Sequence, residues 1–429
     1  MFRGAGESGR VTPDPELELE LTGLTHGGEA VGRLPDGRAC FVAYAIPGER
    51  VRVRVVEHRR RWARAEVLAV LRPSPDRVEP PCPYFGPDRC GGCQLQHVSP
   101  ERQAEMKRQV VVEQLQRLGG IASPPVASTV RPGGSGWLRG YRTSARFAVD
   151  GVGRLGFRRA ASHAVVPIDR CLLLTDGTQA LRDAAGDAWA GAAEVSVRTG
   201  SDGADRAITL QPGPGALPPL PAGDIPVAVV RAGRPVALRG EPAVIEHVAG
   251  VAFRVSPTSF FQSGPAGAEA LVAAVREAAG AGPGDQALDL YAGVGLFARF
   301  LAADGAHVTA VESSKVACDD ARTNLRPVRE RAAVVRSTAE DAVTRLAASG
   351  RTVDIVVLDP PRRGAGPELV SHLARLGARA VVYVSCDPAA LARDARALAG
   401  AGYRLARAVP VDQFGHTAHI ETVATFVPA

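Results

Sequence analysis

The 429-residue chain is predicted to be an α/β protein in which a doubly wound, Rossmann-like sheet follows a mixed central domain and an N-terminal OB-like β-barrel. From residue 284 onward, apolar strands alternate with helical segments. Short alternating strands broken by glycine turns occupy 16–69, and a stretch with five prolines, 73–83, follows them. We therefore expect three domains, with limits at 14–74, 75–262 and 263–429.

The predicted barrel has about five strands and a basic end. The residues before it, 1–14, are rich in glycine and are expected to form a loose tail. In the last two strands, Trp62 and a single acid, Glu57, stand among six arginines: Arg52, Arg54, Arg59, Arg60, Arg61 and Arg64. OB-like barrels often bind nucleic acid, so we expect this end to contact RNA. The alternative is a solvated basic edge strand that discourages aggregation.

Composition sets wider limits on function. The formal net charge of +6 suggests an anionic partner, but lysine occurs only at 107 and 315, and a genomic bias toward arginine could produce the same excess. No run of about 18 apolar residues exists, and residues 1–11 lack the apolar core of a secretory signal. We expect a cytoplasmic monomer that does not enter a membrane. Its seven cysteines are then metal ligands or nucleophiles rather than disulfides.

Three of the cysteines form a close cluster. Cys82, Cys90 and Cys93 have the spacing C-x7-C-x2-C, with glycines between the last two. Glycine-rich loops can bring thiolates together, and a closed metal site needs a fourth ligand. Cys171, which follows a predicted strand at 164–168, is the candidate. Zinc is the generic metal for such a set, and three unrelated loop thiols are the alternative.

The central region contributes one helix and one basic segment. Residues 101–118 have the apolar spacing of a packing helix. In 131–159, aromatic residues alternate with arginines, a mixture that can clamp phosphates and stack on unpaired bases. These residues are Trp137, Arg139, Tyr141, Arg142, Arg146, Phe147, Arg154, Phe157, Arg158 and Arg159. A half-buried sheet with arginines on its wet face would give the same pattern. Residues 172–250 show strands and loops with no recognisable chemistry.

The C-terminal part opens with a cofactor-like turn. A predicted strand, 286–291, enters a turn containing Gly293 and Gly295, and a helix follows. Glycines at this place let the backbone approach a ligand. The next predicted strand ends in Glu312, where a carboxylate can accept hydrogen bonds from a ribose. Ala298 completes a variant of the dinucleotide-binding turn, so the spacing alone does not exclude a dehydrogenase.

A second strand end favours methyl transfer. The predicted strand 353–358 is followed by Asp359, two prolines and Arg362. An Asp followed by rigid prolines is typical of methyl-transfer sites, in which enzymes that methylate amines generally place an aromatic residue after the prolines. Because Arg362 occupies that place, a ring carbon is the better target.

A third strand end supplies a nucleophile. Cys386 ends a predicted buried strand, and Pro388 suits the first turn of the next helix. Carbon 5 of a pyrimidine becomes nucleophilic only after a thiolate adds at carbon 6, and a base must then remove the carbon-5 proton. Glu421, His416 and His419 are the candidate bases. A core thiol at 386 and a surface acid at 421 are the structural alternatives.

Together these residues resemble the cysteine-dependent RNA uracil-5 methyltransferases, over the full length of the chain. The resemblance implies a TRAM domain in the barrel, S-adenosylmethionine as cofactor, Cys386 as the nucleophile and Glu421 as the base. It also replaces zinc by a [4Fe-4S] cluster on Cys82, Cys90, Cys93 and Cys171. The implied cofactor contacts are Gln262, Tyr291, Glu312 and Asp359, beside the turn of Gly293 and Gly295.

The expected activity is the formation of 5-methyluridine in structured RNA, with ribosomal RNA favoured over transfer RNA because the resemblance includes both barrel and cluster. The chain departs from the family pattern at Gly264, Leu296, Asp387 and Gly415. These departures leave open an RNA-binding or assembly protein with reduced catalysis. A cytosine-5 RNA methyltransferase is the enzymatic alternative.

Overall fold

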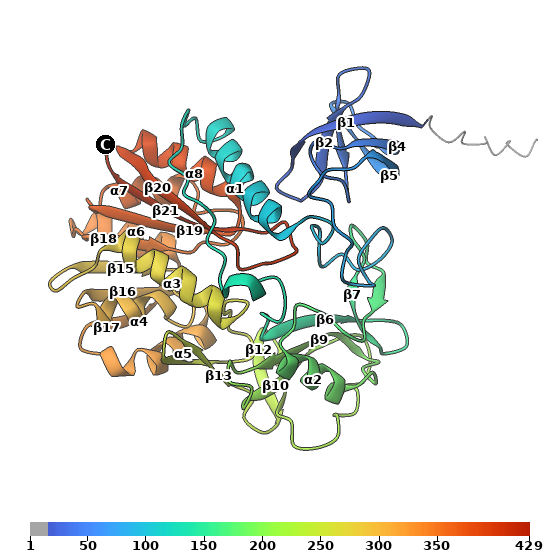
Figure 1. Cartoon of the computed structure of the whole chain (residues 1–429). Coiled ribbons are helices and arrows are strands. Elements are labelled where there is room, and N and C mark those ends of the chain that lie inside the picture. Colours follow the sequence, from blue (N-terminus) through green and yellow to red (C-terminus); the bar gives the residue numbers. More distant parts are fainter. Residues whose placement is uncertain (1–15) are drawn as a thin grey trace, which may run out of the picture. The chain divides into compact units, whose positions relative to one another are not determined.

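A computed structural model describes residues 16–429 of the chain (Figure 1). The predicted tail, 1–14, and the first two residues of the predicted barrel lie outside this range. The described residues form two compact units, one of 16–80 with 94–99 and the other of 81–93 with 100–429. None of the helices in 16–429 has the length and apolar character needed to cross a bilayer.

The first unit is a closed five-stranded barrel with the strand order β1-β2-β3-β5-β4, which confirms the predicted OB-like barrel. Its strands are β1 Leu17–Leu24, β2 Ala30–Arg33, β3 Ala39–Val42, β4 Arg50–His58 and β5 Trp62–Arg72. Along β4 the valines at 51, 53 and 55 point into the barrel while the intervening arginines point out. This alternation is what a sheet with one buried face requires.

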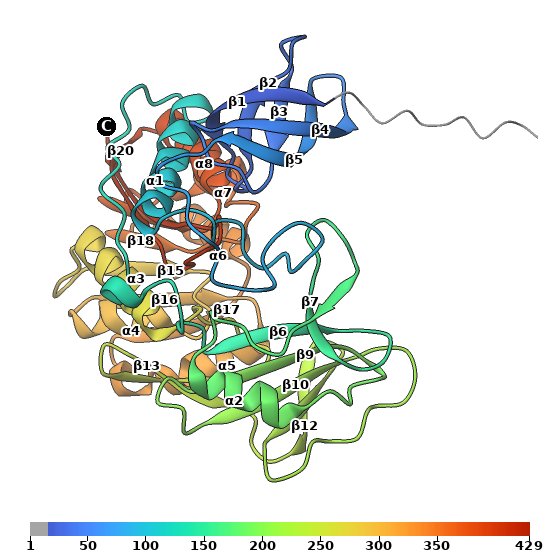
Figure 2. The ribbon, with the colours of Figure 1, turned by 45° about the vertical axis from the view of Figure 1, so that its right-hand side comes forward.

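The central part of the second unit contains a seven-stranded sheet in the order β12-β11-β10-β9-β6-β7-β8. Its elements are η1 Gly134–Gly136, β6 Ser144–Val149, β7 Leu155–Arg158, β8 Val165–Pro167, α2 Asp176–Ala185, β9 Ala192–Thr199, β10 Arg206–Pro212, β11 Val227–Arg231 and β12 Arg234–Arg239. Helix α2 lies across this sheet (Figure 2), and its Leu181 packs with Phe147 and Ile208 in one apolar core. The opposite face of β6, β9 and β10 is polar.

A second seven-stranded sheet forms the C-terminal part, in the order β17-β16-β15-β18-β19-β21-β20. Its strands are β15 Gln286–Leu290, β16 His307–Glu312, β17 Ala332–Arg336, β18 Ile355–Leu358, β19 Ala380–Ser385, β20 Tyr403–Val411 and β21 Glu421–Pro428. The first five strands are parallel, but β21 is antiparallel to both neighbours. Before this sheet in the chain, β13 Val244–Val248 and β14 Val251–Val255 form a separate two-stranded antiparallel sheet.

Helices cover both faces of this C-terminal sheet, which confirms the doubly wound α/β prediction (Figure 1). They are α1 Pro100–Arg117, α3 Pro265–Ala279, α4 Leu296–Ala303, α5 Lys315–Asn324, η2 Arg326–Val328, α6 Ala339–Ala348, α7 Pro367–Ala374 and α8 Pro388–Gly400. Along β19, Val382 and Val384 join the core with α3 and α4, while Val381 and Tyr383 join the core with α7 and α8. A strand that is buried on both faces accounts for the continuous apolar run in the sequence.

Candidate active site

Cys386 and Glu421 lie at facing positions at one end of the C-terminal sheet. Strands β19 and β21 are antiparallel, and Ser385 pairs with Thr422 at one end of their ladder. Cys386 follows Ser385 and Glu421 precedes Thr422, so the next step of the same ladder would bring them opposite each other. Pro388 begins α8 directly behind the thiol, as predicted. The sheet topology therefore brings together a thiol and a carboxyl group that are 35 residues apart in the chain.

The glycine turn after β15 is held by two carboxyl groups. Asp289 Oδ2 accepts a hydrogen bond from Ala298 N at 2.8 Å, and Glu312 Oε2 accepts one from Gly293 N at 3.0 Å. Gly293 and Gly295 have φ angles of 55° and 86°, which favour glycine. A Cβ atom on Gly293 would meet no atom within 4 Å, so the turn borders open space that a ligand could fill.

A pocket lies against this turn. Its walls are Phe260, Phe261, Gln262, Tyr291, Ala292, Gly293, Val294, Leu296, Phe297 and Asp359. Four of the predicted cofactor contacts, Gln262, Tyr291, Gly293 and Asp359, are thus brought together. Gly295 and Glu312 do not line the pocket and instead support its turn from behind. The pocket joins strand ends β15 and β18, where doubly wound sheets bind their ligands.

Acidic groups concentrate around this pocket. Burial raises the pKa of Asp289 to about 8 and that of Asp359 to about 7. Burial, together with the nearby Asp359 carboxyl, raises the pKa of Glu421 well above its usual range. Glu421 Oε2 and Asp289 Oδ1 are buried and have no hydrogen-bond partner in the described structure. A cationic ligand would relieve this crowding of carboxyl groups, so the site suits a positively charged sulfonium.

The same environment acts on the thiol. Burial and the neighbouring carboxyl groups of Glu421 and Asp359 raise the pKa of Cys386 to about 11, while the Arg362 guanidinium acts in the opposite direction. Thiolate, rather than thiol, is the nucleophilic form. Of the groups that shift this pKa, Arg362 is the one cation, and it favours the reactive thiolate form of Cys386.

Helix α1 anchors the loop 412–420, which leads into Glu421. Lys107 Nζ donates a hydrogen bond to Asp412 Oδ1 at 2.6 Å, and Gln103 Oε1 accepts one from the backbone N of His416 at 3.1 Å. Further along the loop, Gln413 Nε2 donates to the Gln262 side chain at 2.9 Å. The Gln413 side chain also hydrogen-bonds the Glu421 carboxyl group. One loop thus links helix α1, the pocket and the candidate base.

The two histidines of this loop differ in their surroundings. His416 is buried, burial lowers its pKa to about 4, and its Nδ1 lies 3.3 Å from Gln103 Nε2. His419 is half-buried, and its Nε2 lies 3.5 Å from Arg362 Nη2. A neutral, buried His416 serves to hold the loop, and the candidate base closest to the thiol along the ladder is Glu421.

Local packing explains the departures from the family pattern. Gly264 begins the turn into α3, and a Cβ there would lie 1.8 Å from the backbone oxygen of Tyr141. A Cβ on Gly415 would lie 2.7 Å from a neighbouring backbone atom. Asp387 caps α8 by accepting a hydrogen bond from its backbone, and Leu296 is a buried residue of α4. All four departures lie at other positions, so the Cys386 thiol and the Glu421 carboxyl group are both retained.

The four cysteines predicted to hold a cluster lie in one region. All four cysteines are half-buried, and none of these four forms a disulfide. Burial raises the pKa of Cys90 to about 11, and the nearby Cys171 and Cys82 thiols add to the shift. However, no group of three or more His, Cys, Asp or Glu side chains within 16–429 is arranged to hold a metal ion. The iron-sulfur cluster is therefore not supported by this arrangement and stays a prediction.

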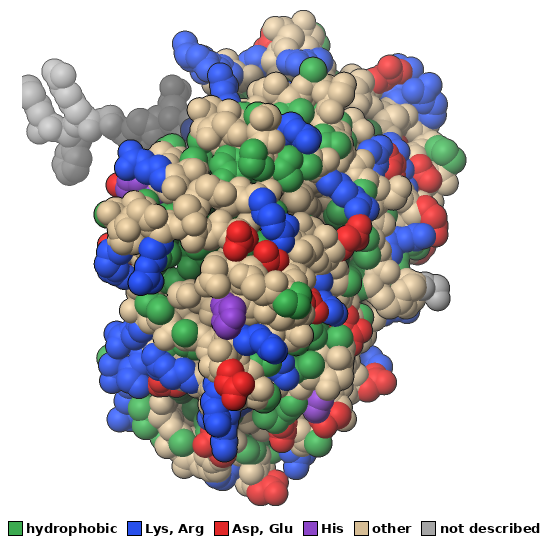
Figure 3. Space-filling view, turned by 90° about the vertical axis from the view of Figure 1, so that its left-hand side faces the viewer, with side chains coloured by type: hydrophobic (Ala, Val, Ile, Leu, Met, Phe, Trp, Pro, Cys, Tyr) green, Lys and Arg blue, Asp and Glu red, His purple; other side chains and the backbone are tan. Residues whose placement is uncertain are grey.

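Several arginines at the basic end of the barrel form ion pairs. Arg59 lies 2.7 Å from Glu57, Arg64 lies 2.9 Å from Glu29, and Arg52 lies 3.9 Å from a carboxylate of β1. Glu57 was evident from the local sequence, but Glu29, in the turn before β2, and the β1 acid Glu18 were not. Mixed charge is not confined to the barrel, since on the face of the molecule shown in Figure 3 Lys and Arg side chains are also interspersed with Asp and Glu side chains. Exposed pairs of this kind are weak, so the arginines can exchange a carboxylate for a phosphate.

Sequence reasoning missed two groups that the fold places at the site. Phe260 has 69% of its surface exposed beside the pocket, which is unusual for a ring of this size. Gln413 connects the pocket with Glu421. The signal for Gln413 was its place in the stretch 412–421, but a single sequence gives no means of choosing among those polar residues.

Family models match two parts of the chain. Residues 246–426 match the model described as tRNA (uracil-5-)-methyltransferase, and residues 12–68 match the TRAM domain. The first match spans the pocket, Cys386 and Glu421. The second spans the barrel.

Relatives match along nearly the whole chain. An uncharacterized RNA methyltransferase of Streptomyces coelicolor is 41% identical over 96% of this chain and 93% of its own length. A 23S rRNA (uracil(1939)-C(5))-methyltransferase, RlmD, of Alkalilimnicola ehrlichii is 35% identical over 98% of both chains. Among solved structures, the tRNA (uracil-54, C5)-methyltransferase of Pyrococcus abyssi, in complex with S-adenosyl-L-homocysteine, is 26% identical with a TM-score of 0.71, covering 95% of this chain and 99% of its own.

Proposed function

This chain belongs to the RNA (uracil-5-)-methyltransferase family, and we propose that it transfers a methyl group from S-adenosylmethionine to carbon 5 of a uridine in ribosomal RNA. The observation that carries the proposal is the facing placement of Cys386 and Glu421 beside the glycine-turn pocket. Relatives named for 23S ribosomal RNA, matched over nearly all of this chain, favour that RNA.

Cys386 acts as the nucleophile. Its thiolate forms a bond from Sγ to carbon 6 of the uracil ring, and the electrons of the carbon 5–carbon 6 double bond move toward carbon 5 and the carbonyl at carbon 4. Carbon 5 then takes the methyl group, whose bond to the sulfonium sulfur breaks. Arg362, which favours the thiolate, assists the first of these steps.

Glu421 acts as the base. After methyl transfer, carbon 5 still carries its proton, and removal of that proton restores the double bond as the bond from Sγ to carbon 6 breaks. A carboxylate with a raised pKa is a stronger base than an ordinary one, and the environment of Glu421 raises its pKa. Its unpartnered Oε2 atom is free to receive the proton.

S-adenosylmethionine fits the pocket of the glycine turn. The donor of the methyl group is cationic, and the surrounding carboxyl groups of Asp289, Asp359 and Glu421 suit that charge. We assign Glu312 to the ribose hydroxyls, and Gln262, Tyr291 and Asp359 to the rest of the ligand, beside Gly293 and Gly295. The family's relation to a protein solved with S-adenosyl-L-homocysteine supports this assignment.

The three predicted domains divide the work. We assign 14–74 to RNA binding, 75–262 to positioning the RNA, and 263–429 to methyl transfer. The match of the barrel to the TRAM domain supports the first assignment. A ribosomal RNA substrate would place the enzyme in the cytoplasm.

We also assign a [4Fe-4S] cluster to Cys82, Cys90, Cys93 and Cys171. The thiols are the right donor type, and the pKa of Cys90 responds to both Cys82 and Cys171. Anaerobically purified protein should contain about four irons per chain and absorb broadly in the visible range. Cys171→Ser should lose most of this iron, while Cys318→Ser should keep it. Stoichiometric zinc without iron would contradict the assignment.

A methyl-transfer assay tests the main proposal. Ribosomal RNA and transfer RNA from a strain lacking the gene would be incubated with the protein and S-adenosylmethionine labelled in its methyl group. We expect label in ribosomal RNA as 5-methyluridine, and none with Cys386→Ala. Label in transfer RNA would correct the substrate, label in cytidine would identify a cytosine methyltransferase, and no label in any RNA would favour an RNA-binding protein.

A further inference from the structure

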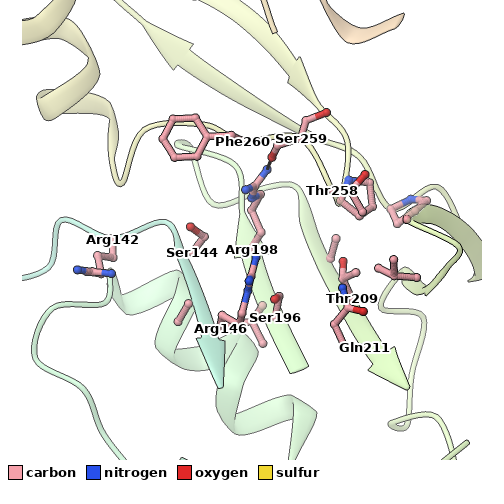
Figure 4. A pocket seen from close by; sticks show the side chains of 17 residues that line it. Arg142, Ser144, Arg146, Ser196, Arg198, Thr209, Gln211, Thr258, Ser259 and Phe260 are labelled. Carbon is pink, nitrogen blue, oxygen red and sulfur yellow. Dashed lines mark hydrogen bonds between the residues drawn. The ribbon is translucent and has the colours of Figure 1, made fainter. Parts of the chain in front are cut away.

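A second, larger cavity lies on the polar face of the central sheet. Its volume is about 520 Å³, within the range of ligand sites in proteins. Strands β6, β9, β10 and β11 form its floor, and the segment 257–260 forms one side (Figure 4). The methyl-transfer chemistry described above uses none of the residues of this floor.

The side chains of the floor all lie on one face of neighbouring strands. Ser144 of β6 pairs with Arg198 of β9, and Arg146 pairs with Ser196. On the other side of β9, Ser196 pairs with Thr209 of β10. These side chains share one face because successive residues of a strand alternate, and the residues between them form the apolar core under α2.

The cavity is cationic. Three arginines line it, Arg142, Arg146 and Arg198, and no Asp or Glu is among its lining residues. Glu194, just outside, lies 3.9 Å from Arg146 Nε, and that Arg146 side chain is 71% exposed, so the pair is weak. Arg198 Nη1 donates a hydrogen bond to Ser259 O at 3.2 Å, as Figure 4 shows, and the Glu246 and Asp320 carboxylates, which do not line the cavity, act on its guanidinium from a distance. Concave sites of one charge attract the opposite charge strongly.

The polar side chains of the floor are available to a ligand. Ser144, Ser196, Thr209 and Gln211 make no side-chain hydrogen bond to any residue in the described part of the chain. A sheet face that is merely solvated would show the same hydroxyl groups, but it would not be walled into a cavity together with the guanidinium groups of Arg146 and Arg198, whereas the Arg142 guanidinium points away from it (Figure 4). Guanidinium groups bind phosphate oxygens, while hydroxyl and amide groups bind ribose hydroxyls and base edges.

The cavity and the pocket of the glycine turn share one wall residue. Phe260 lines both this cavity and the pocket of the glycine turn. The next residues of the same segment, Phe261 and Gln262, belong to that pocket. The segment 257–262 thus borders both spaces, so an RNA strand bound at the pocket of the glycine turn can extend along this segment toward the cavity.

We propose that this cavity is a second nucleotide subsite, which binds a nucleotide flanking the target uridine, with its phosphate at Arg146 and Arg198 and its ribose or base at Ser196, Thr209 and Gln211. The inference rests on the proposed RNA methylation and adds a determinant of which RNA is chosen. Single-stranded RNA is commonly read by such contacts to splayed nucleotides.

The test compares matched variants of the full chain. Arg146→Gln removes an exposed guanidinium inside the cavity, and Arg206→Gln removes an exposed one on β10 outside it. The probe is a transcript of about 30 nucleotides around the uridine mapped in the methylation assay. For Arg146→Gln we expect KM for the transcript to rise about tenfold with kcat within about twofold, and the slope of log Kd against log salt to fall by about one. Arg206→Gln should change neither quantity.

A second variant and a second ligand complete the test. Thr209→Val should raise KM about threefold without changing the salt slope, because it removes a hydroxyl and no charge. Equal effects of Arg146→Gln and Arg206→Gln would overturn the subsite, as would unchanged binding in both. Tight binding of free UMP, AMP or GMP that Arg146→Gln abolishes would overturn it in favour of a free-nucleotide site. Arg146-dependent binding of the transcript without methyl transfer would count against the proposed function alone.

Discussion

Lys107 Nζ lies 2.6 Å from Asp412 Oδ1, and both side chains are buried. The pair joins helix α1 to the start of the loop 412–420, and the same ammonium group donates to Phe414 O at 3.1 Å. Burial lowers the pKa of Lys107 and raises that of Asp412, and the pair opposes both shifts. The position of the loop that leads to Glu421 therefore depends on this buried ion pair, in which each charge is stabilised by the other.

Breaking this pair should destabilise the protein strongly. Lys107→Met leaves Asp412 buried without a counter-charge, and we expect a loss of about 3–5 kcal/mol, measured by denaturant or thermal unfolding. The double variant Lys107→Met with Asp412→Leu should recover much of this loss. The only other lysine, Lys315, pairs with Asp319 at the surface and offers a matched control: Lys315→Met should cost less than about 1 kcal/mol. Equal losses of unfolding free energy for the two lysine variants would show that the buried pair stabilises the protein no more than the surface pair does.

Much of the fold could be predicted because local patterns carried it. The strand before Cys386 is buried on both faces, which produces a continuous apolar run, and Pro388 marks the helix that follows. The glycine turn and Glu312 could be predicted for a similar reason, since a strand, a turn and a second strand occupy neighbouring positions in the chain. The antiparallel course of β21 could not, because the pairing of residues 381–385 with 422–426 depends on distant segments.

The rest of the site was hidden for physical reasons. Arg198, Thr209 and Gln211 look like ordinary residues of alternating strands, and only the pairing of β6, β9 and β10 puts them in one cavity. The barrel arginines were predicted to stand almost without acids, whereas the folded barrel supplies carboxylates from distant parts of the chain, such as Glu29. Charge in a sequence window therefore does not give the local charge of the folded surface.

Asp289 should make stability depend on pH. Its pKa in the folded protein is raised to about 8, above its ordinary value of 3.8, so the unfolded chain releases this proton at lower pH. The associated stability is complete below about pH 4 and is lost as the pH rises toward 8. Asp289→Asn cannot ionise, so the Tm of this variant relative to the natural chain should rise between pH 5 and pH 8.

Thermal unfolding at several pH values and constant ionic strength measures this effect. Asp319→Asn is the control, because Lys315 at the surface lowers the pKa of Asp319 below its ordinary value of 3.8, so the Tm difference between this variant and the natural chain should stay constant from pH 5 to pH 8. A difference in Tm between Asp289→Asn and the natural chain that stays constant from pH 5 to pH 8 would mean that Asp289 does not titrate in this range.

Cys386 should react as a thiol with a high pKa. With a pKa of about 11, roughly one group in ten thousand is thiolate at pH 7, so alkylation by iodoacetamide should quicken about tenfold per pH unit up to at least pH 9. Arg362→Gln should slow this reaction, since it removes a group that lowers the pKa of the thiol. Mass spectrometry of the tryptic peptide 380–393, which contains one cysteine, gives the rate. Arg363→Gln is the matched control, and a plateau near pH 8 would show that the thiol is more acidic than its surroundings indicate.

Substitutions of Cys386 and Glu421 should stop the reaction at different steps, the first before the covalent adduct forms and the second before it breaks down. Cys386→Ala removes the atom that adds to carbon 6, so methylation and any RNA–protein adduct should both disappear while S-adenosylmethionine still binds. Glu421→Gln keeps addition and methyl transfer but cannot remove the carbon-5 proton, so the Sγ–carbon 6 bond should persist. A methyl-labelled RNA–protein adduct should then accumulate and survive denaturing electrophoresis. If Glu421→Gln turned over at the natural rate without an adduct, the base would lie elsewhere, and His419, which is half-buried beside Arg362, would be the next residue to replace.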